Sequence, residues 1–406
     1  MRLSRSRAGR TVLAGCSVAL VAVAAAFTGT DTVAGSATAA EFDIRGLDIG
    51  NYQTVPRQYY GFFNPTMRSG SSLAVARLAE HTINGIDIDP KLRHHRMVKA
   101  ITAPNDVIRV LATGAADILA RHGMKFGFGV GNADRASTKG QNGGFTAVGM
   151  MIMQFPDPSA AAAAAIEVEA ADFAVAAGQN VPVALPKYPA AKAHWRPGIG
   201  TLGLNYAHGH YLVNMLVEYP SPDLPGMVAL AERALDLQVG KLDALPPLTD
   251  REILHLDPGA GDMLGRTVYS SGQIYPDMPV DVPLGPNAVL HFSEDPVEQR
   301  GRLGEAGVDL IFNSEAGSTW RARDEAAATV LLERTAKLRG EHGTPIDPPK
   351  GLPGAKCFEG AGTGSGSPKF SCIVRYGRYV GAVAGAQRQD VYHRTSAQYV
   401  LFVRNR

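Results

Sequence analysis

The amino-acid sequence predicts an α+β protein with two domains, in which mainly antiparallel sheets of ferredoxin-like character carry helices on one face. Apolar runs of strand length alternate along the chain with single helical segments, an interleaving that is typical of this class. Short turns that contain proline separate the runs from the helices. Beyond the first 40 of its 406 residues, the chain is still long enough to form two hydrophobic cores.

The N-terminal segment has the three parts of a secretory signal peptide. An apolar run at residues 11–27 leads into polar residues and then into Ala37-Thr38-Ala39, the small-x-small pattern that signal peptidase cleaves. The basic residues ahead of the run are Arg2, Arg5, Arg7 and Arg10. We therefore predict a signal peptide at residues 1–39 and a mature protein in the cell envelope or outside the cell.

Two other interpretations of this segment stay open. Leu13-Ala14-Gly15-Cys16 has the form of a lipobox, in which Cys16 would carry a lipid, although most of the apolar run follows this cysteine. The run of 17 residues also lies at the lower limit for a membrane-spanning helix, so an uncleaved anchor is the third interpretation. Either alternative would associate the protein with a membrane.

The mature chain is nearly neutral. Without residues 1–40 it keeps 36 basic and 37 acidic side chains, and they form no basic block. Nucleic-acid binding therefore has no electrostatic support. Because the chain is predicted to be exported, we expect an unknown envelope ligand or envelope protein as the partner, and no sequence feature calls for a cofactor.

Cys357 and Cys372 are the two cysteines of the mature chain, and an even count in an exported protein is normally a disulfide. The segment between them is rich in glycine and serine and has no periodicity. We predict that the disulfide closes this loop, which would otherwise be loosely held. A two-cysteine metal site or a redox pair is the alternative.

The first part of the mature chain is the less regular one. Its pattern predicts helices at residues 71–80 and 106–121 and a strand at residues 124–130. From residue 146 onward, a unit of strand, aromatic residue, proline-containing turn and helix recurs. In its first copy, the strand at residues 146–154 precedes a helix at residues 159–177 that Ser159 or Asp157 caps and Gly178 ends.

The later copies follow the same plan. The second has a strand at residues 211–218 and a helix from Asp223 that stops at Gly240. The third has a strand at residues 288–292, a helix that ends at Ala306 and a strand at residues 308–312. The fourth has a strand at residues 372–383 and a helix or strand at residues 390–403.

Two prolines at residues 246 and 247 separate a finished helix from a new start. We place the domain boundary there. The predicted domains are residues 40–246 and residues 247–406. The second domain contains the loop 357–372, which the predicted disulfide closes.

Several short segments resemble one family. They lie at residues 47–57, 154–157, 308–310, 321–326, 375–380 and 396–399, and with the cysteine pair they extend over nearly the whole mature chain. In order and spacing the chain is similar to uncharacterised secreted lipoproteins of high-GC Gram-positive bacteria, built from a domain of unknown function and a companion C-terminal domain. The resemblance implies an envelope location and no catalytic residues. Where the family has its lipid-bearing cysteine, this chain has Phe27-Thr28-Gly29-Thr30.

Two clusters are candidate binding residues. One is the dense aromatic run Tyr59, Tyr60, Phe62 and Phe63, which would line an apolar groove or belong to a core. The other is the pair His94 and His95 between two arginines, which would bind an anion or respond to pH, or lie in a solvated loop or helix end.

Metal and nucleotide sites have weak signals only. His208 and His210 would share one face of a strand, but a third ligand is not evident nearby. The run at residues 127–131 has glycines at alternate positions, but it lacks a third glycine at the spacing of a dinucleotide-binding loop. Residues 259–262 also lack that glycine, so neither segment matches the motif. The elbow, zinc-helix and Ser-x-x-Lys motifs of hydrolases do not occur in a plausible frame.

These observations favour an exported protein that binds a ligand or partner without catalysis. An envelope hydrolase, with a site assembled from distant parts of the chain, is the alternative. A purely structural protein would instead show a broad apolar patch and no cavity.

Overall fold

The computed structural model describes residues 43–58, 63–136, 144–360 and 368–405. These residues form two antiparallel sheets of seven strands each, together with helices, which confirms the predicted α+β class. Within the described chain, no helix combines the length and the apolar character needed to cross a membrane. The predicted signal peptide at residues 1–39 lies outside the described residues.

The first sheet has the spatial order β1-β2-β3-β7-β6-β5-β4. Its strands are β1 (His94–Ile101), β2 (Phe126–Ala133), β3 (Ala147–Gln154), β4 (Val181–Val183), β5 (Lys192–Trp195), β6 (Thr201–His208) and β7 (Tyr211–Glu218). The helices of this region are α2 (Met67–Glu80), α3 (Gly85–Ile88), α4 (Ala115–Arg121), α5 (Pro158–Ala174), α6 (Leu224–Asp243) and α7 (Asp250–Leu254).

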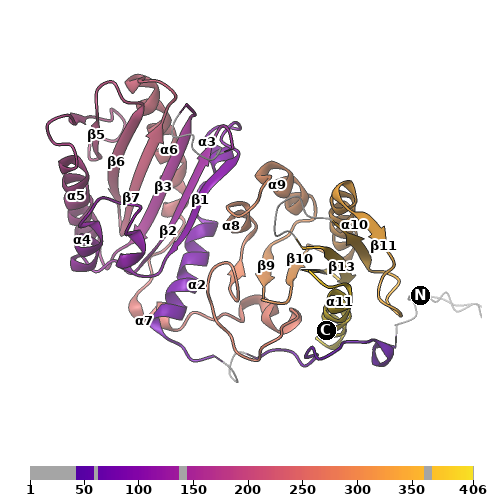
Figure 1. Ribbon diagram of the computed structural model, residues 1–406. Helices are drawn as coiled ribbons and strands as arrows, with labels where there is room; N and C mark the ends of the chain where they lie inside the picture. The colour runs from indigo at the N-terminus through magenta and orange to yellow at the C-terminus, as the bar shows by residue number, and fades with distance from the viewer. Residues whose placement is uncertain (1–42, 59–62, 137–143, 361–367, 406) are drawn as a thin grey trace, which may run out of the picture. The chain divides into compact units, whose positions relative to one another are not determined.

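Helices cover both faces of this sheet, so the prediction of one covered face was wrong. Met151, Met153 and Leu212 pack with α4 and α5 in one cluster. Phe128 and Ile152 belong to another cluster, which includes α2 and α6. Figure 1 shows α4 and α5 along one side of the sheet. The physical reason is that the central strands are apolar on both sides, and all eight residues of β2 are buried.

The unit of strand, proline turn and helix is present twice in the first sheet. Asp157 caps α5 by accepting a hydrogen bond from the backbone of Ala160, and Asp223 caps α6 in the same way. The predicted end of the second helix was wrong, because α6 continues through Gly240 to Asp243. The predicted helix at residues 106–121 is also broken. A 3-10 turn, η2 (Pro104–Val107), precedes α4, and Gly114 lies between them with a positive φ of 88°.

The second sheet has the order β11-β12-β13-β14-β10-β9-β8. Its strands are β8 (Pro283–Leu284), β9 (Leu310–Asn313), β10 (Ser318–Arg321), β11 (Thr344–Ile346), β12 (Lys356–Glu359), β13 (Phe370–Tyr376) and β14 (Tyr379–Gly385). The helices of this region are α8 (Pro286–Leu290), α9 (Pro296–Glu305), α10 (Glu325–His342) and α11 (Arg388–Arg404). The remaining short 3-10 turns are η1 (Ile44–Gly46), η3 (Ala260–Asp262) and η4 (Leu264–Arg266).

The second sheet also carries helices on both faces. Ile373 and Phe358 pack in the cluster that includes α10, whereas Cys372 and Val383 pack with α11. Two of the strands predicted for this region differ in the structure. The run at residues 288–292, predicted as a strand, instead contains the end of α8, which Pro286 opens at its first turn and which ends at Leu290. The run at residues 372–383 forms two strands, because Gly377 turns the chain with a positive φ of 52°.

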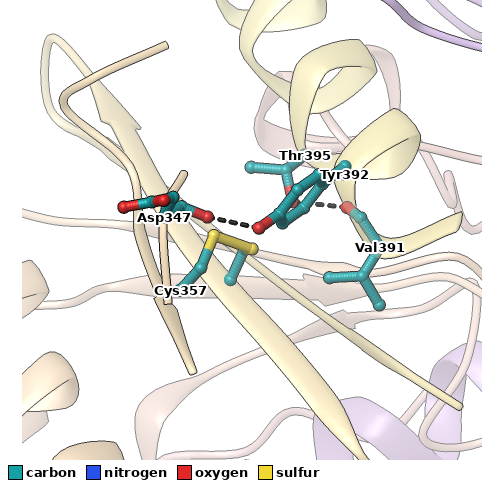
Figure 2. The surroundings of a disulfide bond; sticks show 6 residues. Asp347, Cys357, Val391, Tyr392 and Thr395 are labelled. Carbon is teal, nitrogen blue, oxygen red and sulfur yellow. Dashed lines mark hydrogen bonds between the residues drawn. A yellow bond between two sulfur atoms is a disulfide. The ribbon is translucent and has the colours of Figure 1, made fainter. Parts of the chain in front are cut away.

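The predicted disulfide is present. Cys357 of β12 and Cys372 of β13 are directly opposite each other in the sheet, with their Cα atoms 4.1 Å apart. Figure 2 shows the disulfide beside Tyr392 of α11, whose hydroxyl donates a hydrogen bond to the backbone carbonyl of Asp347. The covalent link therefore joins two strands under α11, at a place where the helix is tied to the segment that precedes β12.

The first described segment of the chain packs against its last helix. The Tyr52 hydroxyl donates to the carboxylate of Asp390 at 2.6 Å, and Leu47 packs beside Val400 of α11. The Arg57 guanidinium forms a buried ion pair with Asp281 at 2.9 Å. Burial nevertheless raises the pKa of the Asp281 carboxyl. The domain boundary at residues 246 and 247 stays a prediction.

A buried histidine joins α8 to α2 and β2. One ring nitrogen of His291 lies 3.0 Å from the Ala79 carbonyl oxygen, and the ring lies 5.1 Å from that of Phe128. His291 is 1% exposed, and its Nδ1 atom has no hydrogen-bond partner within the part of the chain described. Burial lowers its pKa to about 4, so the imidazole is neutral in the folded protein near neutral pH.

His291 makes the fold sensitive to acid. Because its folded pKa lies below the unfolded value of about 6.5, stability is complete above that value and is lost as the pH falls toward 4. We expect the parent protein to lose about 3 kcal/mol more unfolding free energy between pH 7 and pH 4 than His291→Phe. Urea unfolding at several pH values checks this. Equal losses in the two proteins would contradict it.

Candidate functional site

A row of glycines crosses the middle of the first sheet. Gly131 of β2 is paired with Gly149 of β3. Gly149 is paired with Leu216 of β7, and Leu216 with Gly203 of β6. Residues paired across antiparallel strands project to the same face, so three positions of this row lack a side chain on the face toward α5.

The missing side chains leave a pocket of about 310 Å³, here called the glycine-row pocket. This volume is at the lower end of the range for small-molecule sites. Side chains that take part in the wall include Met97, Val110, Leu111, Met151, Asp172, Asn214, Leu216, Arg96 and Glu218. Residues of five neighbouring strands, β1, β2, β3, β7 and β6, thus line the pocket, and the loop after η2 and the end of α5 border it.

The space above two of the glycines is open. A Cβ atom placed on Gly149 would meet only the carbonyl oxygen of Leu216, at 3.9 Å, and one on Gly131 would make ordinary contacts beginning at 3.6 Å. Neither glycine has a positive φ. The backbone therefore does not require glycine at either position, and the main effect of the missing side chains is to leave room above the sheet.

Apolar side chains at the mouth of the pocket face solvent. Leu216, between two glycines of the row, is 43% exposed although it lies in the centre of the sheet, and Val110 is 36% exposed. Met97 and Leu111 are partly buried and pack on the cluster under α5. A central strand position is normally covered, so this exposure indicates a surface that is suited to an apolar ligand.

One end of the pocket rests on a chain of buried polar groups. His194 of β5 hydrogen-bonds through Nδ1 to the carboxylate of Glu169 at 2.7 Å. The amide of Asn205 donates to the same carboxylate at 3.0 Å, and the amide of Asn214 donates to the Asn205 oxygen at 3.1 Å. Because Glu169 is 8% exposed, these bonds compensate a carboxylate that would otherwise be costly to bury.

The ionisable groups at this end have shifted pKa values. The hydrogen bond to Glu169 raises the pKa of His194 against the opposing effect of burial. Burial raises the pKa of Asp172, which lies one turn further along α5 and reaches the pocket. A Cβ atom on Gly203 would lie 3.1 Å from the His194 ring and 3.6 Å from an Asp172 carboxylate oxygen. Gly203 therefore accommodates both side chains.

At the opposite end, Arg96 of β1 forms an ion pair with Glu218 of β7 at 3.3 Å. The Arg96 guanidinium also lies 4.0 Å from the centre of the Phe145 ring. The positive charge of Arg96 is therefore already compensated by the Glu218 carboxylate within the protein. The lining consequently combines an apolar centre, a paired arginine and two carboxyl groups.

The hydrogen bonds of His194 bear on the chemistry that this end of the pocket could support. His194 has the acid partner that a general base requires, but among the described residues no hydroxyl or thiol hydrogen-bonds to it. A search of the same residues finds no group of three or more His, Cys, Asp or Glu side chains that could hold a metal ion.

The predicted binding residues lie partly elsewhere. Tyr59, Tyr60 and Phe62 are outside the described residues, and Phe63 packs beside Met263, Leu264, Ile274 and Phe312. His94 and His95 begin β1, and His95 is exposed. Their neighbour Arg96, part of the same charged run, is the residue that lines the pocket. The role of these residues stays a prediction.

His208 and His210 flank the turn between β6 and β7. His208 hydrogen-bonds to Asp243 of α6 at 2.7 Å, whereas the Nδ1 atom of His210 lies 3.4 Å from the Phe155 carbonyl oxygen. Each imidazole therefore has its own partner on a different element. This arrangement accounts for both residues without a metal.

The sequence did contain a signal for the glycine-row pocket. Glycines at alternate positions of residues 127–131 project to one face of β2, as do single glycines in β3 and β6. The pattern does not match a phosphate-binding loop, because such a loop leads into a helix and residues 127–131 lie inside the strand β2. Glycine inside a strand is also a known mark of close approach by a ligand or another backbone.

Comparison with known proteins identifies a family but no activity. The N-terminal family model, described as a domain of unknown function (DUF7373), matches residues 63–258, and its C-terminal companion matches residues 263–405. No curated protein matches the chain. Among solved structures, the extracellular domain of PknH from Mycobacterium tuberculosis is 14% identical, with a TM-score of 0.27 over 40% of this chain and 93% of that one.

The His194 and Glu169 pair is open to direct titration. We expect the His194 imidazole to titrate above pH 6.5, and Glu169→Gln to lower its midpoint because the hydrogen-bonded carboxylate is lost. The pair therefore stabilises the fold fully below pH 6.5 and less as the pH rises through the folded pKa. Proton NMR of the imidazole measures the midpoint. Glu167→Gln, two residues away on α5, is the control and leaves the midpoint unchanged.

Proposed function

We propose that this chain, which belongs to the DUF7373 family of domains of unknown function, binds a small and largely apolar ligand in the glycine-row pocket without chemical conversion. The observation that carries the proposal is the open space over Gly131 and Gly149 beside the exposed Leu216. Apolar ligands gain affinity by burying such a surface.

The polar lining narrows the ligand class. Arg96 is already paired with Glu218, and Asp172 adds a second carboxyl group. An anion would therefore meet negative groups and no unpaired positive charge in this lining. We infer a ligand with an apolar body and a neutral or hydrogen-bond-donating polar group, which the Asn214 and Asp172 end would receive.

The site of action that we propose is outside the cytoplasm. Support comes from the signal-like pattern of residues 1–39 and from the disulfide between Cys357 and Cys372, because disulfides persist in oxidising compartments. The ligand would then be an envelope component or a small molecule of the surroundings.

Filling the pocket tests the function. We expect Gly149→Leu to place its side chain in the open space and to weaken binding of the neutral fluorophore N-phenyl-1-naphthylamine at least about tenfold, while the melting temperature changes little. Fluorescence titration gives the dissociation constant. Gly178→Leu is the matched control, because a Cβ atom at Gly178 also meets nothing within 4 Å but lies outside this pocket.

If Gly149→Leu does not fold, Gly149→Ala provides the same test with a smaller side chain and a smaller expected loss. Equal fluorophore affinity in a folded Gly149 variant and in the Gly178→Leu control would show that the pocket is not the binding site.

Export is tested by intact mass of the protein from culture supernatant and from the membrane fraction. We expect a soluble species that begins at Ala40 and gains two hydrogen atoms on reduction, as the disulfide requires. A membrane species with a diacylglyceryl group on Cys16 would contradict cleavage after Ala39 and establish a lipid-tethered protein.

A further inference from the structure

A second pocket lies in the other sheet, between its strands and α10. Its volume is about 270 Å³, and we call it the Arg339 pocket. The residues that matter for its chemistry are Ser318, Trp320, Arg339, Ser371, Ala382 and Ala384. None of them contributes to the glycine-row pocket, so the two sites are independent.

Small side chains make room for this pocket. In the sheet, Ser318 of β10 is paired with Ala382 of β14, and Ala384 of β14 with Ser371 of β13. These residues lie on the same face as Ile373, the face that α10 covers. The floor is thus built from alanines and serines, beside the larger ring of Trp320.

Ser371 brings a buried hydroxyl without a partner. The residue is 2% exposed, and in the described chain its Oγ atom has no hydrogen bond. Buried polar atoms are nearly always hydrogen-bonded, since an unsatisfied one loses its interaction with water and gains nothing. The hydroxyl lines the pocket, so a ligand oxygen there would supply the missing partner.

Arg339 brings a positive charge without a counterion. It lies in the last turns of α10, and the residues that the structure describes include none in hydrogen-bond or ion-pair contact with it. Burial lowers the pKa of its guanidinium, and Arg302 adds a second positive charge nearby. The Arg302 guanidinium forms an ion pair with Glu298, whose carboxylate lies 3.6 Å from its Nε atom, so Arg339 is the unpaired one of the two arginines among the described residues. A guanidinium still carries its charge under such conditions.

The other ionic groups of the pocket already have partners. Glu315 accepts hydrogen bonds from the backbone of Ser270 at 2.6 Å and of Ser271 at 3.0 Å. Arg394 pairs with Asp390 at 2.5 Å. The unmatched groups are therefore the Arg339 guanidinium and the Ser371 hydroxyl, and both are hydrogen-bond donors.

We propose that the Arg339 pocket binds a small molecule with an oxyanion group, a carboxylate or a phosphate, whose oxygens accept hydrogen bonds from Arg339 and Ser371. Arginine matches the planar, two-oxygen face of such groups. The apolar part of the ligand lies against Trp320 and the alanines of β14. Such a ligand would satisfy two groups that the protein leaves unmatched.

The fluorescence of Trp320 can report anion binding to the Arg339 pocket in the full-length protein. The protein has two tryptophans, so Trp195→Phe leaves Trp320 as the fluorescent one. In that background we expect benzoate, inorganic phosphate or both to change the emission in a saturable way. Benzamide, the neutral isostere of benzoate, is expected to give no change. A response to benzoate alone identifies a carboxylate site, and a response to phosphate alone identifies a phosphate site.

Single substitutions distinguish a loss of anion binding from a loss of folding. We expect Arg339→Gln to weaken binding of the responding anion at least tenfold, which corresponds to about 1.4 kcal/mol. Arg334→Gln on the same helix is the control and keeps full affinity, because Arg334 is paired with Glu305. Ser371→Ala is expected to lower affinity while the melting temperature stays equal or rises, since it removes an unsatisfied hydroxyl.

If Arg339→Gln does not fold, the affinity of Ser371→Ala for the anion still tests the proposal, because this variant is expected to stay folded. The proposal is wrong if neither anion changes the Trp320 emission, if benzamide binds as well as benzoate, or if the folded Arg339 and Ser371 variants both keep the affinity of the Arg334→Gln control.

Discussion

Alternation of side chains along paired antiparallel strands is the constraint on which both halves of the structure depend. Successive residues project to opposite faces, and paired residues stand side by side on one face. Because helices cover both faces of each sheet, a shift of one residue would exchange two different sets of core contacts. The same register aligns Gly131, Gly149 and Gly203, so three distant segments create one gap in a single layer of side chains.

The two pockets differ in how the fold satisfies their polar groups. Around the glycine row, His194 is matched by Glu169, and Arg96 by Glu218. In the Arg339 pocket, the guanidinium and the Ser371 hydroxyl are unmatched. A buried hydrogen-bond donor without an acceptor lowers the stability of the fold, whereas a buried pair that is fully hydrogen-bonded changes the stability little. The first pocket is therefore suited to an apolar molecule and the second to an anion.

Local patterns predicted a good part of the fold. The elements β3, α5, β7 and α6 follow from strand-length apolar runs, proline turns and aspartate caps, all of which act within a few residues. The short run at residues 288–292 was misassigned, because a run of five mostly apolar residues fits a buried helix as well as a strand. The missed break at Gly377 depended on one backbone angle, which an apolar run does not reveal.

By itself, the sequence determined the α+β class, the two proline-turn units and the disulfide, because each depends on composition or on neighbours in the chain. Neither pocket was predicted from it. Gly131 and Gly149 adjoin only through strand pairing, and Gly203 joins their row only across β7. Arg339 and Ser371 line one pocket only because α10 packs on the face of β13 that carries Ser371. Tertiary structure decided these sites, since register and helix placement bring together residues that no local pattern connects.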